Sequence, residues 1–382
     1  MIGVQGGADE LETWLFERAL PLWWEAGADH RHGGFHESLD REGSPVLAPR
    51  RARTQTRQTW VYATAGVMGW EGPWRAAVEH GLNYLFDRYV RPDGLIRTLV
   101  SPRGDPLDDI PRLYEQAFAL LALAGAAHAG VAPVAMRDRA LAMIAAIERE
   151  FGFGGHSFRE ADRLRPFQSN PLMHLFEASL AWAEIDAAPI WRELGDSLAD
   201  LALTRLVDRT SGALREFFDA NWDPAPGPDG RIVDAGHQFE WAWLLDRWGR
   251  RRAGPQVLPV VRRLFEIGSG PGVDRARGVA INTLDDSLAP LDRDARLWPQ
   301  TERVKAAALM IRIGESAERN LNERELTDAI AGLCRYLAPN GAWLDRLAAD
   351  GGFADGPSPA TSLYHIVGAV AAVSTPAAAR SS

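Results

Sequence analysis

Apolar residues recur along most of the chain with a spacing of about 3.6 residues, which is typical of amphipathic helices. Local signals indicate where helices begin: Pro73 and Pro133 suit first helical turns, and Asp9 followed by Glu12 has the spacing of a capping box. Convincing strand patterns are absent. The sequence therefore predicts an all-α protein with helices near residues 9–26, 54–70, 73–90, 107–129, 134–151, 171–186, 189–208, 236–252, 255–268, 298–315, 321–338 and 362–373.

Glycine-containing segments return about every 60 residues and divide these helices into six pairs. The segments are Gly33-Gly34-Phe35, Asp93-Gly94-Leu95, Gly154-Gly155-His156, Ser211-Gly212-Ala213, Pro271-Gly272-Val273 and Asn340-Gly341-Ala342. A helical hairpin cannot bury its apolar stripe alone, so six of them either stack as an open solenoid or close into a double-layered barrel. The lack of obvious polar terminal caps favours closure. We expect one domain over residues 1–375 and a flexible tail over 376–382.

Polar and aromatic residues gather near the start of the second helix of each pair and recur with the same period. If the second helices form the inner ring, these residues converge at one end of the barrel and line a pocket. They are Arg57, Tyr114, Asn170 with His174, His237 with Glu240, Trp298 with Glu302, and His365.

Two histidines in this set are candidates for proton transfer. His237 and Glu240 are three residues apart and thus share a helical face, where the carboxylate could orient or charge the imidazole. His365 follows a loop rich in glycine and proline and opens the last helix. The alternatives are a hydrogen-bonded polar histidine at position 237 and an interhelical hydrogen bond at position 365.

The other residues of the set suit a polyol ligand. Asn170 and His174 are four residues apart on one face and could bind hydroxyl groups, and Trp298 with Glu302 combines an aromatic platform with a carboxylate. The Arg57 guanidinium can bind two oxygens and stabilise a developing enediolate. A surface salt bridge of Arg57 and core packing of Trp298 remain the alternatives.

Charge and composition exclude several classes of protein. The net charge is -9 and no basic stripe is present, so neither nucleic acid nor a membrane surface is an expected partner. The N-terminus has no signal-peptide pattern and no apolar run reaches the roughly 20 residues of a membrane span, so we expect a cytoplasmic protein.

Cofactor chemistry has few candidate residues. The single cysteine, Cys334, excludes an intramolecular disulfide and a cysteine zinc cage, and its apolar surroundings predict a buried thiol. The only lysine, Lys305, lies in the middle of a helix, which argues against Schiff-base chemistry. His30, His32 and His36 flank a glycine turn without an evident set of further ligands. We therefore expect neither a metal nor a cofactor.

Six motifs together resemble the N-acylglucosamine 2-epimerase superfamily over about residues 30 to 366. They are His32-Gly33-Gly34-Phe35, Arg57-Gln58, Leu113 to Phe118, Asn170 to His174, Gly236 to Trp241, and Trp298 to Glu302. The resemblance implies an (α/α)6 barrel of about twelve helices in six hairpin repeats. It also implies His237 and His365 as the catalytic pair, with sugar contacts from Arg57, Tyr114, Asn170, His174, Glu240, Trp298 and Glu302.

The superfamily includes N-acylglucosamine and cellobiose 2-epimerases as well as mannose and sulfoquinovose isomerases, and the motifs are most similar to those of bacterial mannose isomerases. The tryptophan-containing segment that precedes the last histidine in cellobiose epimerases is missing from Ser358 to Tyr364, which argues against an extended disaccharide site.

The resulting hypothesis is a monosaccharide isomerase, monomeric or homodimeric, that interconverts D-mannose and D-fructose through a cis-enediolate. D-lyxose and D-xylulose form a second expected substrate pair. The alternatives are a sugar 2-epimerase, a glycosidase that uses Glu240 and Glu302, and a noncatalytic sugar-binding or helical interaction protein.

Overall fold

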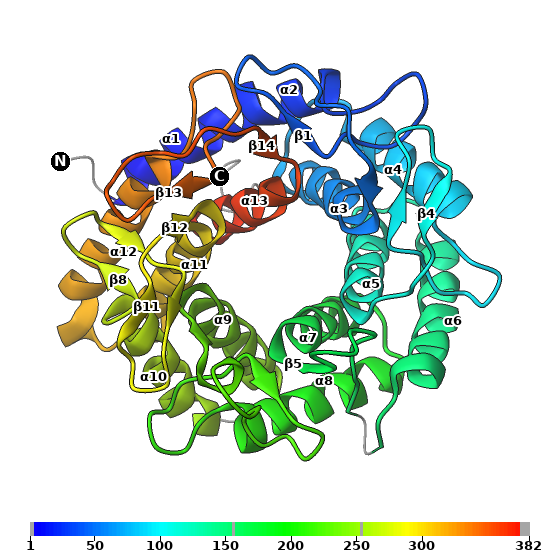
Figure 1. The fold of residues 1–382 in the computed structure, drawn as a ribbon. Helices are drawn as coiled ribbons and strands as arrows, with labels where there is room; N and C mark the ends of the chain where they lie inside the picture. The colour runs from blue at the N-terminus through cyan, green and yellow to red at the C-terminus, as the bar shows by residue number, and fades with distance from the viewer. Residues whose placement is uncertain (1–3, 155–156, 253–254, 375–382) are drawn as a thin grey trace.

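The helices form two concentric rings in the computed structural model, which describes residues 4–154, 157–252 and 255–374 (Figure 1). The inner ring consists of α3 (Ala52–Met68), α5 (Leu113–His128), α7 (Ser169–Ile185), α9 (Ala235–Arg251), α11 (Leu297–Ile313) and α13 (Thr361–Val373). The outer ring consists of α1 (Val4–Trp14) and α2 (Leu20–Glu25), α4 (Trp74–Arg88), α6 (Pro133–Phe151), α8 (Pro189–Leu201), α10 (Leu258–Ser269) and α12 (Arg319–Cys334). Helix α13 packs against both α11 and α3, so the ring is closed. The predicted (α/α)6 barrel is confirmed.

The two rings differ in how their helices bury apolar residues. Helix α8 is amphipathic, because Trp191, Leu194, Leu198 and Ala199 lie on one stripe toward the inner ring. Helix α5 is buried almost all round, from Leu113 to Ala126, since it contacts α3, α7 and α6. A helix enclosed on every side must be apolar throughout, except at an end that opens to water.

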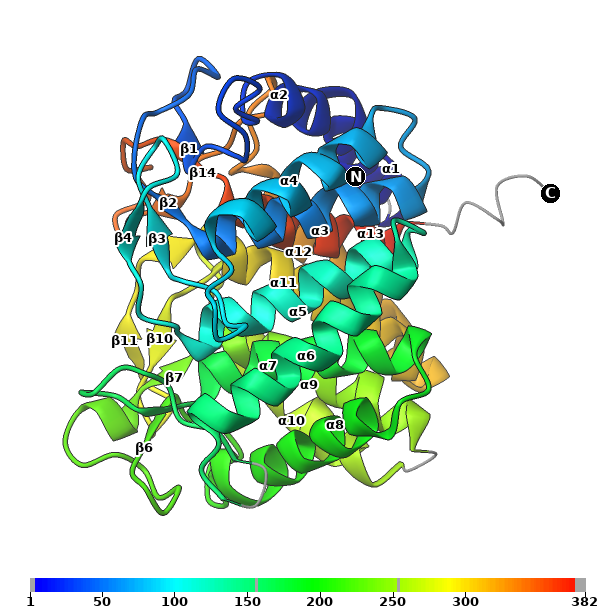
Figure 2. The ribbon, with the colours of Figure 1, turned by 90° about the vertical axis from the view of Figure 1, so that its right-hand side faces the viewer.

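Short antiparallel strands cover the end of the barrel where the inner helices begin (Figure 2). The pairs are β1 (Ser38–Leu39) with β14 (Ser358–Pro359), β5 (Phe167–Gln168) with β6 (Phe217–Phe218), β8 (Val273–Asp274) with β9 (Val279–Ala280), and β12 (Ala295–Arg296) with β13 (Arg346–Leu347). Three-stranded sheets join β2 (Arg50–Arg51), β3 (Leu99–Val100) and β4 (Pro106–Asp108), and also β7 (Val233–Asp234), β10 (Thr283–Leu284) and β11 (Pro290–Asp292). The pairing of β1 with β14 joins the first repeat to the last.

Three sequence expectations need correction. Residues 107–112 do not belong to the helix predicted over 107–129, because Pro106–Asp108 pairs with β3 and α5 begins after Pro111. Asp9 is not a capping residue, since α1 already begins at Val4. Strands are present, although none of those described exceeds three residues, which is too short to produce an alternating pattern.

A side-chain clamp fixes the start of four inner helices. The fourth residue of α3, α5, α9 and α11 is a buried glutamine, and each glutamine amide accepts from the backbone N–H and donates to the backbone C=O of one loop residue, at 2.7–2.9 Å. The pairs are Gln55 with Phe35, Gln116 with Ile96, Gln238 with Leu214, and Gln300 with Ala280. The amide thus forms the two hydrogen bonds that a neighbouring strand would form with this residue. The pairing fixes the position of each helix along its own axis relative to the loop that precedes it.

Cys334 is exposed at the end of α12, so the prediction of a buried thiol was wrong; it is the last residue of an outer helix and lies off the helix's apolar stripe. No helix in the described ranges has the length and apolar composition needed to cross a bilayer. The tail predicted over 376–382 lies outside the described residues.

We predict that Gln116→Met lowers the free energy of unfolding by about 2–6 kcal/mol, because the buried N–H and C=O of Ile96 lose their partners at about 1–3 kcal/mol each. Urea denaturation followed by circular dichroism measures the change. The matched control is Gln5→Met on the exposed face of α1, for which we expect a change within about 0.5 kcal/mol. Equal stabilities of the two variants would contradict the clamp.

Candidate active site

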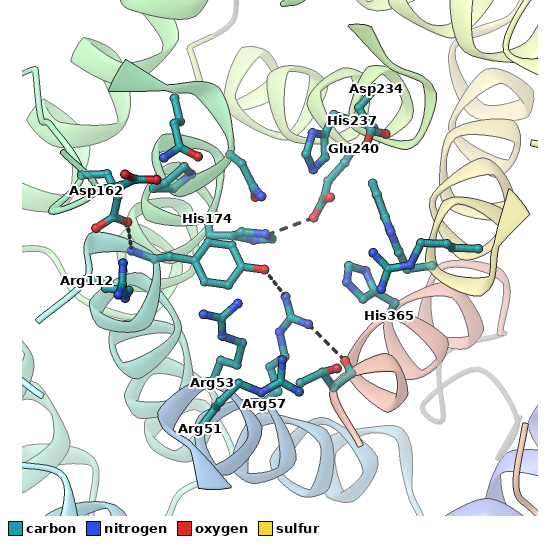
Figure 3. Close-up of a pocket in the computed structure, with 18 residues that line it drawn as sticks. Arg51, Arg53, Arg57, Arg112, Asp162, His174, Asp234, His237, Glu240 and His365 are labelled. Carbon is teal, nitrogen blue, oxygen red and sulfur yellow. Dashed lines mark hydrogen bonds and ion pairs between the residues drawn. The ribbon is translucent and has the colours of Figure 1, made fainter. Parts of the chain in front are cut away.

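A cavity of about 470 Å³ opens at the end of the barrel where the inner helices begin (Figure 3). The structure brings eight of the nine predicted site residues to its wall: Arg57, Tyr114, Asn170, His174, His237, Glu240, Trp298 and His365. They occupy corresponding positions, since Tyr114, Asn170 and Trp298 are second residues of their helices, and Arg57, His174 and Glu240 are sixth residues. The ninth, Glu302, is also a sixth residue, but it is fully buried behind His365 and does not line the cavity.

His237 lies at the start of α9, where the helix N-cap Asp234 accepts hydrogen bonds from the backbone N–H groups of Gly236 and His237. The imidazole Nδ1 lies 2.9 Å from Glu216 Oε1. Burial lowers the pKa of His237, but the charges of Glu216 and Asp234 outweigh burial and raise this pKa to about 10. The ring is therefore protonated near neutral pH. The hydrogen-bond partner of His237 is therefore Glu216 and not Glu240, which the spacing along the helix had suggested.

His365 lies on α13, and its Nδ1 is 2.8 Å from Glu302 Oε1. The other oxygen of Glu302 lies 2.6 Å from Lys305 Nζ, so one carboxylate is shared between a lysine and a histidine. Burial and the positive charges of Arg57 and Lys305 hold the pKa of His365 well below its usual value. His365 is therefore neutral at pH 7, with Nδ1 donating to Glu302 and Nε2 left as an acceptor.

Trp298 lies between the two histidines. The centroid of its ring system is 5.0 Å from the His237 ring and 5.6 Å from the His365 ring. Two histidines thus lie beside the Trp298 ring, and one of them, His237, is charged while the other, His365, is neutral. Two titratable groups with pKa values shifted in opposite directions can act as a general acid and a general base.

Arg57 supplies a fixed positive charge to the wall of the cavity. Its Nη2 donates to the Tyr114 hydroxyl at 2.7 Å and its Nη1 to the backbone C=O of Thr361 at 3.2 Å, while Phe118 and Tyr364 stack on the guanidinium. None of the described carboxylates forms an ion pair with it, so the surface salt bridge considered from the sequence is not what the structure shows. Its charge is available to an oxyanion in the cavity.

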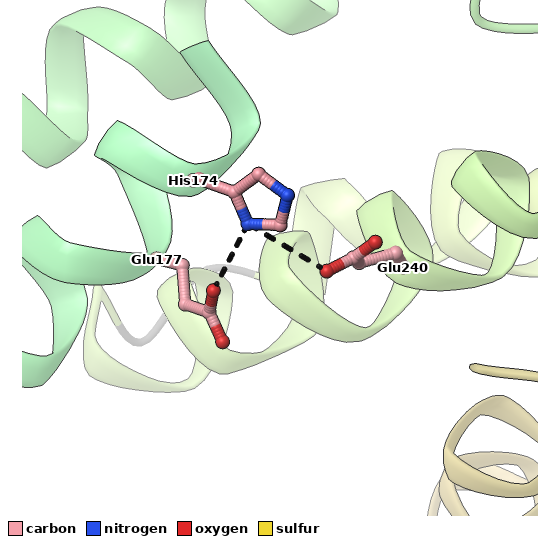
Figure 4. A group of neighbouring side chains, drawn as sticks. All are labelled: His174, Glu177 and Glu240. Carbon is pink, nitrogen blue, oxygen red and sulfur yellow. Dashed lines mark hydrogen bonds and ion pairs between the residues drawn. The ribbon is translucent and has the colours of Figure 1, made fainter. Parts of the chain in front are cut away.

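Three acidic side chains gather at the bottom of the cavity, where Glu240 lines the wall and Glu177 and Glu302 lie behind it. His174 Nδ1 lies 3.3 Å from Glu177 and 3.9 Å from Glu240 (Figure 4). Burial and the neighbouring Glu302 raise the pKa of Glu240 well above its usual value. Glu177 accepts a hydrogen bond from the Tyr364 hydroxyl.

Two groups of these residues bring ligand-type atoms within 4.8 Å of one another: His174, Glu177 and Glu240, and Glu240, Glu302 and His365. Both groups could bind a divalent cation. In this arrangement, Lys305 already pairs with Glu302, one of the carboxylates that such a cation would contact.

Four residues of the site were not predicted from the sequence: Glu177, Glu216, Lys305 and Tyr364. A repeat-based signal for Glu216 does exist. In each repeat, one residue after the glycine turn forms a β-bridge back to the segment before the turn. The residue two positions further along is polar in all six repeats: Glu37, Thr98, Glu160, Glu216, Asn282 and Asp345. These positions face the starts of the inner helices, so alignment of the repeats would have placed Glu216 beside His237.

Comparison with known proteins identifies the family of this chain. A model of the family described as N-acylglucosamine 2-epimerase (GlcNAc 2-epimerase) matches residues 33–369. The chain belongs to the N-acylglucosamine 2-epimerase family. It is 44% identical over 372 residues to a protein of Rhizobium meliloti (strain 1021) named mannose-6-phosphate isomerase, with 95% of each chain covered. It is 31% identical to the D-mannose isomerase of Thermobifida fusca over 78% of each chain.

A crystal structure of a D-mannose isomerase superposes on the chain with a TM-score of 0.86, at 22% identity over 96% of this chain and 97% of the other. At this identity the superposition supports the shared barrel and no finer property. The family and its named relatives are sugar isomerases and epimerases, so this family member is an enzyme of the isomerase class.

We predict that Glu216→Gln lowers the pKa of His237, because the substitution removes the negative charge that contacts its Nδ1. The imidazole resonances of His237, followed by NMR between pH 5 and about 11, give this pKa directly. Glu42→Gln, which neutralises an exposed carboxylate on a loop at the same end of the barrel, is the control and should leave the titration unchanged. An unshifted His237 in Glu216→Gln would show that Glu216 does not set its charge.

Proposed function

We propose that this protein is an aldose–ketose isomerase that interconverts D-mannose and D-fructose through a cis-enediolate. One observation carries the proposal: two buried histidines on either side of Trp298 have pKa values shifted in opposite directions. Relatives named mannose-6-phosphate isomerase and D-mannose isomerase support the reaction type.

The cavity suits an open-chain sugar. Trp298 offers a face for the C–H groups of the chain, and Asn170 Oδ1 and both Glu240 oxygens are buried polar atoms without a hydrogen-bond partner among the described residues. Hydroxyl groups would satisfy all three atoms. Because burial raises the pKa of Glu240, its protonated form becomes more accessible, and in that form the carboxyl can also donate a hydrogen bond to the substrate.

In the proposed mechanism, neutral His365 removes the proton from C2 through Nε2, and protonated His237 donates its Nε2 proton to the aldehyde oxygen O1. The fixed charge of Arg57 stabilises the cis-enediolate, whose negative charge lies on O1 until the proton from His237 arrives there. His365 then returns its proton to C1, while the O2 hydroxyl gives its proton to His237 as the C2 carbonyl forms. The ketose is complete, and both histidines return to their initial protonation states.

A sugar 2-epimerase is the second candidate, because a protonated His237 could deliver its proton to the opposite face of C2 instead. The glycosidase considered from the sequence receives less support, since Glu302 lies behind His365 and only Glu240 of that pair lines the cavity.

We predict that His237→Gln and His365→Gln each lower the turnover of D-mannose by at least about 100-fold, the usual contribution of a positioned acid or base. Proton NMR in D₂O follows fructose formation and deuterium incorporation at C1 and C2. The matched control is His128→Gln, an exposed histidine at the last residue of α5, which should leave turnover unchanged. Glucose as the sole product would instead identify a 2-epimerase, and unchanged turnover in both site variants would refute the mechanism.

The proposed roles also predict the pH profile of kcat/KM. Activity rises as His365 loses its proton, with a midpoint below pH 6.5, and falls as His237 loses its proton near pH 10. In Glu216→Gln the alkaline limb moves to lower pH because His237 deprotonates earlier, while the acid limb stays in place. Steady-state kinetics across this range test the assignment. If Glu216→Gln shifted only the acid limb, His237 would be the base and His365 the acid.

A further inference from the structure

Arginines are concentrated in the cavity to an extent that a neutral sugar does not require. The net charge of the chain is -9, yet five arginines line the cavity: Arg51, Arg53, Arg57, Arg112 and Arg296. Four carboxyl residues share the wall, namely Glu160, Asp162, Asp234 and Glu240. Four of the arginines also pair with carboxylates, since Arg51 contacts Glu37, Arg53 contacts Glu115, Arg112 contacts Asp108 and Arg296 contacts Asp345. The cavity therefore presents an unusual number of guanidinium N–H donors, which suit the oxygens of an anionic group.

Three of these arginines form one side of the cavity. Arg51 is the N-cap of α3, Arg53 follows one residue after the start of this helix, and Arg112 is the N-cap of α5, the neighbour of α3 in the ring. Figure 3 shows Arg51, Arg53 and Arg112 together, on the side away from His237. We call this group the arginine edge.

These positions are unfavourable for helix stability. N-cap positions favour Ser, Thr, Asp or Asn, whose side chains accept a backbone hydrogen bond, and the positive end of the helix dipole repels a cation. Neither Arg51 nor Arg112 makes a capping hydrogen bond. Cationic side chains at two adjacent helix N-termini thus add to the dipoles and produce a site for an anion.

Two of the guanidinium groups are held in place from behind. Glu37 accepts from the backbone N–H and the Nε of Arg51 at 2.6 and 2.7 Å, and the buried Glu115 accepts from the same two groups of Arg53 at 2.6 Å each. Arg53 also stacks on the Tyr114 ring. Within the described residues, no hydrogen bond involves Nη1 of either arginine, so an oriented N–H edge remains on each.

The arginine edge lies across the cavity from His237 and Trp298. His237 is on α9, opposite α3 in the ring, and Trp298 is on α11, opposite α5. A sugar with C1 and C2 beside the two histidines therefore extends its far end, C5 and C6, toward α3 and α5.

We propose that Arg53 and Arg112, with Arg51 at the rim, form a subsite for a phosphate group at C6, so that the physiological substrate is an aldose 6-phosphate. This inference rests on the proposed isomerase function and specifies its substrate class. Oriented guanidinium groups match the tetrahedral oxygens of phosphate, and these hydrogen bonds are charge-assisted. Sulfate at C6 offers the same geometry with one negative charge.

The experiment compares kcat/KM of the wild-type enzyme for D-mannose, mannose 6-phosphate and mannose 6-sulfate. We expect mannose 6-phosphate to be preferred over mannose by about 100-fold or more, as several charge-assisted hydrogen bonds would give. Arg112→Met should lower kcat/KM for mannose 6-phosphate by about 10-fold and that for mannose by less than about 3-fold. Arg324→Met, which removes an equal charge from the exposed face of α12, is the control and should change neither value.

Arg112 provides the decisive variant, because Arg53→Met would also leave the fully buried Glu115 without its cation and could unfold the chain. The guanidinium of Arg112 is one-third exposed and lies 3.5 Å from Asp108, which is itself partly exposed. Three outcomes overturn the subsite: no preference for the phosphorylated sugar, an equal loss for both sugars in Arg112→Met, or equal kcat/KM for mannose 6-sulfate.

A binding measurement separates failure of the subsite from failure of the isomerase function. If no sugar is isomerised, the proposed function is wrong, and titration calorimetry with mannose 6-phosphate decides on the subsite alone. Binding that is tighter than that of mannose and weakened by Arg112→Met upholds the subsite, whereas absence of binding overturns it. Isomerisation of mannose without any effect of phosphate leaves the function intact and rejects the subsite.

Discussion

The site depends on one constraint: the inner helices must all begin at nearly the same depth in the barrel. The glutamine clamps impose it by pairing the fourth residue of four inner helices with the backbone of the preceding loop. Because Arg57 and Glu240 lie two residues beyond their clamps, and His237 one residue before its clamp, a shift of one helix by a single residue would turn these side chains away from the cavity. The clamps use buried hydrogen bonds, which have no alternative partner once water is excluded.

The chemistry depends on how charge is distributed among buried groups. Both histidines contact a carboxylate through Nδ1, so local geometry alone would predict two similar groups. The difference lies one contact further away, because Glu302 also pairs with Lys305 whereas Glu216 accepts only a hydroxyl hydrogen bond from Ser169. Burial, Arg57 and Lys305 together keep His365 neutral, whereas the charges of Glu216 and Asp234 keep His237 protonated. Lys305 was considered from the sequence only as a Schiff-base candidate, but its structural role is electrostatic.

Periodicity made the fold and the location of the site predictable. Apolar spacing located the helices, and the return of polar residues every repeat predicted that they would meet at one end of a closed ring. The partners of those residues were not predictable in the same way. Spacing along a helix suggested Glu240 beside His237, whereas the actual partner, Glu216, comes from a loop, and loop contacts leave no 3.6-residue signal. The short strands were missed for the same reason, since two or three residues cannot show an alternation.

Ring closure also determines when the active site is complete during synthesis of the chain. The proposed base, His365, is on α13, the last described helix, and this helix docks between the first and the fifth inner helices, where Gln58 donates to the C=O of Ala360 at 2.7 Å. A nascent chain that ends after α11 contains His237, Trp298 and the arginines of the cavity, but it lacks His365 and has an open gap in its ring. The order of residues along the gene therefore means that the proposed base is translated after every other wall of the cavity.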